Sequence, residues 1–146
     1  MSDDTYNGWS NRETWAANLH WSSNEGDYEL IREWAEYLAG PVPNWYTKDE
    51  AVADLAERLQ KYAEEIYGMV VGNDYGLTGD RPAVLFVSDV GSLWRIDFHE
   101  IAEHWIADVI ADREYEKAEA GSAAAAVAAA WLIVLVAALL VLGGVA

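Results

Sequence analysis

The chain contains no cysteine among its 146 residues, which excludes disulfides, thiolate metal sites and a cysteine nucleophile. This absence leaves the redox compartment open, because a protein without cysteine folds in any compartment. Basic side chains are scarce: 9 Lys and Arg stand against 25 Asp and Glu, which gives a net charge of −16. Proteins bind nucleic-acid phosphate through Lys and Arg, so the charge balance argues against direct binding of DNA or RNA.

The acidity has two competing interpretations. A dense carboxylate surface suits high salt, where screening reduces its self-repulsion, and the low lysine content (Lys48, Lys61 and Lys117) agrees with that interpretation. Alternatively, an acidic body could imitate DNA and inhibit a DNA-binding protein. The acidic residues are spread over every predicted helix and do not gather in a phosphate-like row, so we favour salt adaptation.

Charge is absent from the C-terminal part of the chain, since no ionisable side chain follows Glu119. Residues 123–142, AAAAVAAAWLIVLVAALLVL, form a run of 20 apolar residues. At about 1.5 Å per residue, a helix of that length spans about 30 Å, the thickness of the hydrocarbon core of a bilayer. The acidic body is too small to enclose such a helix. The run predicts a single C-terminal transmembrane helix, with the lipid bilayer as its partner.

Basic residues near this helix predict the side of the membrane on which the body lies. Arg113 and Lys117 precede the helix and no Lys or Arg follows it, so the positive-inside rule places the body on the cytoplasmic or virion-interior side. The alanine-rich first half of the run has two interpretations. Small residues allow close packing against another helix, in a homo-oligomer or with a protein partner. Alanine is also simply the strongest helix former.

The periodicity of apolar residues predicts an all-α body of about four helices, followed by the membrane helix. We divide the chain into a flexible N-terminus (1–5), an acidic helical body (6–119) and a membrane anchor (120–146). One segment is ambiguous, because Val84–Val87 is apolar and mostly β-prone, which would make the fold α+β with a short strand. A lone strand would have no visible partner, so we favour a helix there.

Local signals place the beginnings of the predicted helices. Two capping boxes, in which Ser or Thr is followed by Glu three residues later, are predicted at Ser10–Glu13 for the first helix and at Thr47–Glu50 for the third. The spacing of apolar residues predicts the second helix over 27–39, after a turn in the segment SSNEG. Asp97 begins the fourth helix.

The segment HEIAEH, His99 to His104, must be compared with the helical zinc motifs HExxH and HxxEH, and it fits neither. Glu100, His104 and Asp108 share one helix face at i, i+4 and i+8, and could hold a metal with help from elsewhere. This weak candidate underlies one alternative function, a metal-dependent enzyme that uses Glu100 and His104. We favour a solvated face of an acidic helix. The sequence contains no catalytic motif and no cofactor signature, so no cofactor is expected.

The segment YNGWSNRETW, residues 6–15, is the most distinctive part of the body. It resembles the start of a family of small proteins of unknown function from phages, plasmids and halophilic archaea, whose pattern is approximately N-G-W-x-N-x-x-T-W. The segment IDFHEIAEHW, residues 96–105, looks like the closing helix of that family, so the resemblance covers residues 6–110. It implies a compact α-helical fold and no known reaction, and the membrane helix departs from the soluble members. The matching residues are Asn7, Gly8, Trp9, Asn11, Thr14 and Trp15.

Spacing predicts a structural role for this motif. Asn7-Gly8 is a turn dipeptide that tolerates positive φ. Trp9, Trp15 and Trp21 are six residues apart, about 240° around a helix at each step, so they cannot form one stripe. We expect them to pack into different parts of the core, and a ligand-binding aromatic surface is the alternative. The exposure of the Trp9 indole decides between the two.

Together these features predict a non-enzymatic, tail-anchored membrane protein that displays an acidic helical interaction domain. A virion envelope component, or an accessory protein that acts on a host partner, would have this organisation in a halophile or its virus. The inhibitor of a DNA-binding protein and the metal-dependent enzyme are the alternatives.

Overall fold

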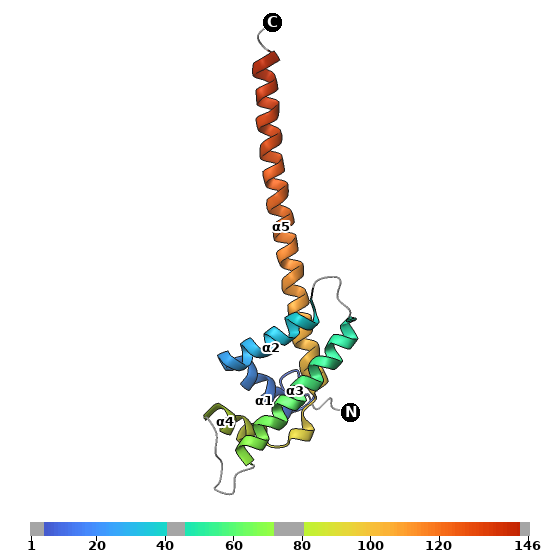
Figure 1. Ribbon diagram of the computed structural model, residues 1–146, viewed down its shortest axis with the longest axis vertical. Coiled ribbons are helices and arrows are strands. Elements are labelled where there is room, and N and C mark those ends of the chain that lie inside the picture. Colours follow the sequence, from blue (N-terminus) through green and yellow to red (C-terminus); the bar gives the residue numbers. More distant parts are fainter. Residues whose placement is uncertain (1–4, 41–45, 72–80, 144–146) are drawn as a thin grey trace. The chain divides into compact units, whose positions relative to one another are not determined.

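The computed structural model describes residues 5–40, 46–71 and 81–143, with side chains up to residue 135 except that of Arg81. These ranges contain no β-strand, so the all-α class is confirmed and the alternative of a strand at Val84–Val87 is wrong. Of the predicted flexible terminus, residues 1–4 lie outside the described residues. The elements are α1 (Arg12–Ser23), α2 (Glu25–Leu38), α3 (Lys48–Val71), α4 (Arg81–Val90), the 3₁₀ helix η1 (Leu93–Arg95) and α5 (Phe98–Gly143) (Figure 1).

The chain divides into two compact units, Met1–Val109 and Ile110–Ala146. In the first unit, α1 packs against α2, α4 and η1, and α3 packs against α2 and α4. The α2 and α3 helices and the first part of α5 contribute the apolar faces that the 3–4 spacing of their residues predicts. In α1 the predicted face of Trp15 and Leu19 is wrong, because Leu19 is exposed and Thr14, Ala17 and Trp21 are buried instead. The border predicted from composition, between residues 119 and 120, stays a prediction. The fully buried side chains of the core include Trp21, Ile31, Leu38, Leu55, Leu59, Ile101 and Ile106.

Two predicted helix starts are confirmed. At α3, the Glu50 amide donates to Thr47 Oγ1 at 3.2 Å and the Thr47 amide donates to Glu50 Oε2 at 2.8 Å, the reciprocal pair of a capping box. The hydrogen bonds from the Thr47 backbone, and then from its side chain, lower the pKa of the Glu50 carboxyl. At α5, the Glu100 amide donates to Asp97 Oδ1 at 3.0 Å. Both starts depend on residues close in sequence, which is why sequence patterns locate them.

The predicted capping box at Ser10–Glu13 is wrong. Asn11 is the N-cap of α1, and its Oδ1 accepts from the Thr14 amide at 2.9 Å. The Ser10 amide donates to both carboxylate oxygens of Glu100, at 3.1 Å each. The Glu100 carboxylate, 90 residues away in the sequence, therefore binds the Ser10 amide in place of Glu13. As a result, the N-cap lies one residue later than predicted.

The predicted start of the second helix at Asp27 is too late. Asn24 is the N-cap of α2, because its Oδ1 accepts from the Asp27 amide at 3.1 Å. The helix therefore begins at Glu25 and ends at Leu38. The composition of SSNEG is typical of a turn. In the structure, Asn24 alone separates α1 from α2, because one asparagine both ends the first helix and caps the second.

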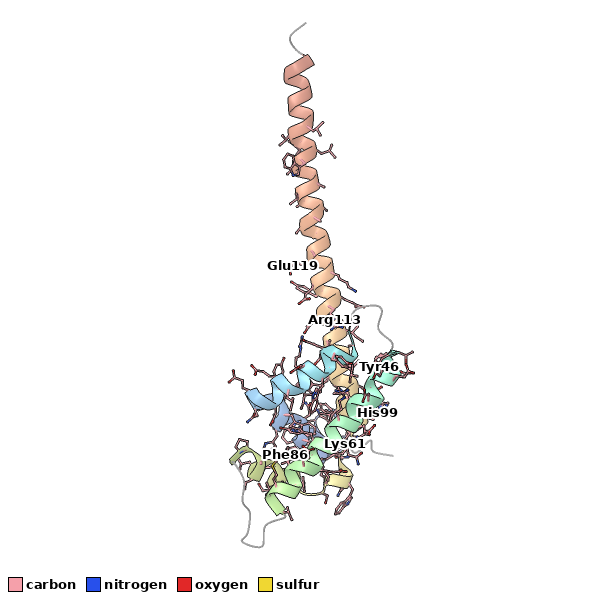
Figure 2. The ribbon with its side chains drawn as sticks, viewed as in Figure 1. Tyr46, Lys61, Phe86, His99, Arg113 and Glu119 are labelled. Atoms are coloured by element: carbon pink, nitrogen blue, oxygen red, sulfur yellow. The ribbon has the colours of Figure 1, made fainter. Side chains whose placement is uncertain are left out.

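The second unit consists of the remainder of α5, which is helical without interruption through Gly121 and Ser122 to Gly143. In the described part of the chain, α5 is the one helix long and apolar enough to cross a membrane. Figure 2 shows Arg113 and Glu119 on α5 before the apolar run. Within that run, the side chains of Trp131–Leu135 are 58–70% exposed.

Candidate functional site

The N-terminal motif begins with a two-residue turn. The Tyr6 amide donates to the Trp9 carbonyl at 2.8 Å, and the Trp9 amide donates to the Tyr6 carbonyl at 3.0 Å. Asn7 and Gly8 between them have φ angles of 52° and 89°. An Asn-Gly dipeptide adopts this left-handed conformation at low cost, as the sequence predicts. The turn leaves Trp9 close to the N-cap of α1.

Asn11 and Thr14 connect the start of α1 to the residues that precede α5. Asn11 Nδ2 donates to the Arg95 carbonyl at 2.8 Å, and the Asp97 amide donates to Thr14 Oγ1 at 2.9 Å. Thr14 Oγ1 donates in turn to Asn11 Oδ1 at 3.0 Å, and the Thr14 side chain is completely buried. An ion pair of 3.2 Å between Arg95 Nε and Glu13 Oε1 reinforces the connection. We call these four interactions the Asn11–Thr14 clamp, because they hold segment 95–97 against α1.

Replacing Thr14 by valine is expected to destabilise the first unit by about 1–3 kcal/mol. Valine fills the same volume but cannot accept from the Asp97 amide, which would lose its partner in a partly buried position. The measurement is the thermal unfolding midpoint of the full-length protein in detergent, followed by near-UV circular dichroism.

Thr14→Ser is the matched control, because it keeps the hydroxyl. We expect this variant to keep the Asp97 amide protected from hydrogen exchange and the valine variant to lose that protection. Equal protection in both variants would show that the hydroxyl does not hold this segment.

The tryptophans of the N-terminal segment make separate contacts, as their spacing predicts. Trp21 is completely buried and stacks on Phe86 of α4, with ring centroids 5.3 Å apart and ring planes at 20°. Trp15 is partly buried and meets the edge of the Tyr6 ring, with centroids 5.1 Å apart. Trp21 is therefore a core residue, while Trp15 fastens the N-terminal turn to α1.

Trp9 is half-buried, and it lies against His104 of α5 with ring centroids 4.4 Å apart and ring planes at 32°. It also borders a cavity of about 160 Å³, together with Tyr28 and Trp105. Trp105 Nε1 donates to Asn18 Oδ1 at 3.0 Å, so the polar atom of that indole is satisfied. Trp9 is thus a packed side chain at the edge of the unit, and its indole does not stand open to solvent as a stacking platform would.

Glu100, His104 and Asp108 share one face of α5, and the first two are engaged in hydrogen bonds. The Glu100 carboxylate accepts from the Ser10 amide, and His104 Nδ1 donates to the Glu100 carbonyl at 2.9 Å. Asp108 is exposed and borders the cavity beside Trp9. Within the described ranges, no group of three or more His, Asp and Glu side chains is placed to hold a metal ion. The structure gives Glu100 and His104 a role in holding the N-terminal motif.

Trp94 is a candidate site residue that the sequence analysis missed. It lies in η1 with 87% of its surface exposed. The turn that carries it is fixed at both ends: the Arg95 carbonyl is held by the Asn11–Thr14 clamp, and the Tyr67 hydroxyl donates to the Gly91 carbonyl at 2.9 Å. Gly91 has a φ of 77°, which a glycine adopts without strain. The backbone turn that presents this large apolar side chain to solvent is therefore fixed on both sides.

Next to Trp94, shallow hollows follow the exposed side of α3. Their walls combine small and apolar side chains with amide and charged ones, among them the Glu57 and Glu64 carboxylates and the Arg95 guanidinium. In the sequence, Trp94 belongs to no periodic stripe, and the Gly91-Ser92 pair shortly before it was the available signal for a turn. We call Trp94 and these hollows the Trp94 surface; its lining residues include Ala53, Ala56, Gln60, Ile96 and Phe98.

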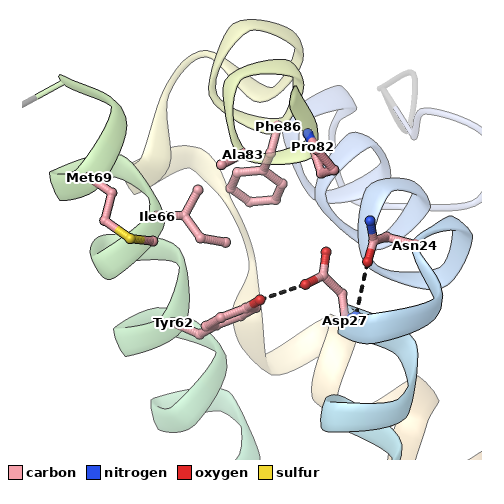
Figure 3. A pocket seen from close by; sticks show the side chains of 8 residues that line it. All are labelled: Asn24, Asp27, Tyr62, Ile66, Met69, Pro82, Ala83 and Phe86. Atoms are coloured by element: carbon pink, nitrogen blue, oxygen red, sulfur yellow. Dashed lines mark hydrogen bonds between the residues drawn. The ribbon is translucent and has the colours of Figure 1, made fainter. Parts of the chain in front are cut away.

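A cavity of about 240 Å³ lies among α2, α3 and α4 (Figure 3). Its polar side comes from three residues: the Tyr62 hydroxyl donates to Asp27 Oδ1 at 2.5 Å, and Asn24 Oδ1 accepts from the Asp27 amide. No sequence pattern assigns these residues a functional role, because Asp27 and Tyr62 lie 35 residues apart and neither belongs to a motif. The remaining wall is apolar and consists of Ile66, Met69, Pro82, Ala83 and Phe86.

Comparison with known proteins gives one similarity. Residues 2–45 match a family of unknown function, DUF7249. The match contains the N-terminal motif, α1 and α2, and it covers less than half of the chain. No curated protein and no solved structure matches the chain. The functional interpretation of this protein therefore depends on its own geometry.

Proposed function

We propose that this protein is a non-enzymatic, tail-anchored membrane protein whose acidic helical unit binds a protein partner. The main observation in favour of a membrane anchor is the exposure of Trp131–Leu135, five consecutive apolar side chains of α5. A soluble protein buries such a helix in its own core, whereas a helix that is apolar all round and uncovered suits lipid. The apolar run 123–142 also has the length that a bilayer crossing requires.

In this proposal the acidic unit lies on the cytoplasmic or virion-interior side. Arg113 and Lys117 precede the apolar run and no basic residue follows it, which is the asymmetry that the positive-inside rule uses. The repulsion between 25 acidic side chains and anionic lipid headgroups also favours a protein partner over the membrane surface as the ligand of this unit.

The Trp94 surface supports the interaction role. An exposed tryptophan in a rigid turn offers a large apolar contact area at a small cost in conformational entropy, and tryptophan is enriched among the residues that dominate binding energies. The net charge of −16 creates a field that attracts basic proteins and repels acidic ones. An envelope component, or an accessory protein that acts on a host protein, would use such a surface.

Membrane fractionation of the full-length protein tests the anchor. We expect the protein in the membrane pellet after washes with molar salt and with alkaline carbonate, and at the top of the gradient after flotation with phosphatidylcholine vesicles. Salt washes remove proteins that are held by charge alone, because screening weakens that attraction. Folded full-length protein in the soluble fraction would exclude the anchor.

Chemical cross-linking in the native membrane tests the interaction role. We expect one or more specific adducts that Trp94→Ala removes. Tyr37→Ala is the matched control, because Tyr37 is also an exposed aromatic side chain of the first unit and lies outside the Trp94 surface. Adducts that are equally abundant in both variants would show that Trp94 does not form the interface.

The interpretation of the acidity as salt adaptation predicts a salt-dependent stability. The thermal unfolding midpoint of the full-length protein should rise from dilute buffer to molar KCl, because screening reduces the repulsion among the carboxylates. Most of the rise should occur below about 1 M, where the Debye length has fallen to about 3 Å. An unfolding midpoint that is independent of KCl would contradict this interpretation.

A further inference from the structure

We propose that the cavity among α2, α3 and α4 binds a primary ammonium group on a small apolar body, with the Asp27 carboxylate as its counter-ion. The inference concerns a small-molecule site and does not depend on the membrane anchor or on the Trp94 surface. It rests on one carboxylate, on the apolar wall opposite to it and on the volume between them.

The Asp27 carboxylate is fixed on one side and open on the other. Its amide is bound by the Asn24 side chain, and its Oδ1 accepts from the Tyr62 hydroxyl at 2.5 Å, so its position is set by residues of two helices. Asp27 also lies in the first turn of α2, where the helix dipole interacts favourably with a negative charge. Oδ2 has no hydrogen-bond donor among the described residues, and it points into the cavity (Figure 3).

The wall that faces Oδ2 is apolar and well fixed. Phe86 is nearly fully buried, and its ring is held by the stacking of Trp21. Ile66 is buried beside it on α3, and Ala83 and Pro82 complete the wall on α4 (Figure 3). A charged oxygen beside such a wall is stabilised when a donor of opposite charge pairs with it.

The volume limits the size of the ligand. A dry cavity of about 150 Å³ holds a benzene molecule, and drug-sized ligands occupy about 300 Å³ or more. At about 240 Å³, this cavity accepts one aromatic ring or a short alkyl chain together with an ammonium group. The faces of the Phe86 and Tyr62 rings add a favourable interaction with a cation.

The chemistry of the cavity ranks the possible ligands. A primary ammonium donates a charge-assisted hydrogen bond to Oδ2 and places its apolar part against Phe86. An alcohol of the same shape can donate but carries no charge. A quaternary ammonium carries the charge but has no hydrogen to donate, and a carboxylate is repelled by Asp27. Affinity should therefore fall in the order primary ammonium, quaternary ammonium or alcohol, carboxylate.

Titration of the full-length protein in detergent with benzylamine at neutral pH tests the site, with methyl NMR as the readout. We expect benzylamine to shift the methyl signals of Ile66, Met69 and Ala83. Benzyl alcohol and benzyltrimethylammonium should each bind at least about tenfold more weakly than benzylamine, and benzoate should not bind. Nα-acetyl-lysine amide distinguishes a small free amine from the lysine side chain of a peptide. If it binds as tightly as benzylamine, the ligand is a peptide and the small-molecule site is overturned.

Two variants connect the binding to Asp27 and to the cavity. Asp27→Asn retains an oxygen that accepts from the Tyr62 hydroxyl but removes the charge, so benzylamine affinity should fall about tenfold or more. Ala83→Leu fills the cavity and should abolish the methyl shifts. Asp49→Asn makes the same change of charge in the first turn of α3, away from the cavity, and should leave the affinity unchanged.

These variants also separate specific binding from attraction to the acidic surface. Non-specific attraction would be reduced equally by Asp27→Asn and Asp49→Asn, because each removes one negative charge. Equal affinities in wild type and Asp27→Asn, binding that survives Ala83→Leu, or the absence of any shift with benzylamine would each overturn the proposal. Amide spectra of Asp27→Asn and Ala83→Leu establish that both variants are folded.

Discussion

Replacing Trp21 by alanine is expected to lower the free energy of unfolding of the first unit by about 3–5 kcal/mol. The indole is completely buried, and it lies between aromatic rings of three other elements. Its centroid is 5.3 Å from that of Phe86, 6.3 Å from that of Tyr62 and 6.4 Å from that of Phe98. Alanine would remove the common neighbour of these rings and leave a cavity that the surrounding helices fill only in part.

One feature of Trp21 reduces the loss of unfolding free energy that is expected for the alanine variant. Its Nε1 is buried and has no hydrogen-bond partner among the described residues, which destabilises the folded state. Trp21→Phe removes this polar atom and keeps an aromatic ring, so it should cost much less than alanine. A loss for Trp21→Phe as large as that for Trp21→Ala would mean that the ring stacking is not the main contribution.

The measurement is thermal unfolding of the full-length protein in detergent, followed by near-UV circular dichroism, because the far-UV signal contains the apolar helix as well. A loss of 3–5 kcal/mol corresponds to a decrease of roughly 10–20 °C in the midpoint for a unit of this size. Trp94→Ala is the matched control, since Trp94 is 87% exposed and its removal creates no cavity. Equal midpoints for the two alanine variants would place Trp21 outside the core.

Placing arginine at both Leu132 and Leu135 is expected to release the protein from the membrane. The two residues lie near the middle of the apolar run 123–142, and both are exposed on α5. Each arginine costs about 2.5–3.5 kcal/mol at the centre of a transmembrane helix. The two changes together should shift the insertion equilibrium by about ten-thousandfold or more, and the measurement is the fraction of full-length protein that floats with vesicles.

The matched control adds the same charge outside the run. Ala118→Arg with Ala120→Arg places two arginines in the acidic segment before the apolar residues, where they face water or lipid headgroups. This variant should float as the wild type does. If the Leu132 and Leu135 variant also remains with the vesicles, the apolar run does not cross the bilayer.

The arrangement of the N-terminal motif shows where sequence reasoning succeeded and where it could not. Its turn was predicted, because Asn7-Gly8 determines its own conformation. Its cap was predicted one residue too early, because the Ser10 amide binds Glu100 and not Glu13. The carboxylates of Glu13 and Glu100 are chemically alike, and only the packing of α5 beside α1 decides which of them reaches the Ser10 amide.

The candidate sites were largely beyond prediction. Trp94 and Trp21 are the same residue type, yet one is almost fully exposed and the other completely buried. Trp94 stands in a 3₁₀ helix, outside any periodic stripe, so no pattern of neighbours predicts its exposure. The pairing of Asp27 with Tyr62 joins two helices whose individual sequences contain no signal for each other.

The sequence by itself determined the features that depend on neighbouring residues. The apolar run of 20 residues, the helical periodicity, the Thr47–Glu50 capping box and the start of α5 at Asp97 all follow from interactions within a few positions along the chain. The tertiary structure alone decided which carboxylate meets the Ser10 amide, which tryptophan is buried and which aspartate faces a cavity. Periodicity shows which face of a helix is apolar, but it does not show which helix packs against that face, because the two helices lie far apart in the sequence. Polar side chains at the edges of the packed faces then bind whichever donor or acceptor the packing brings within reach.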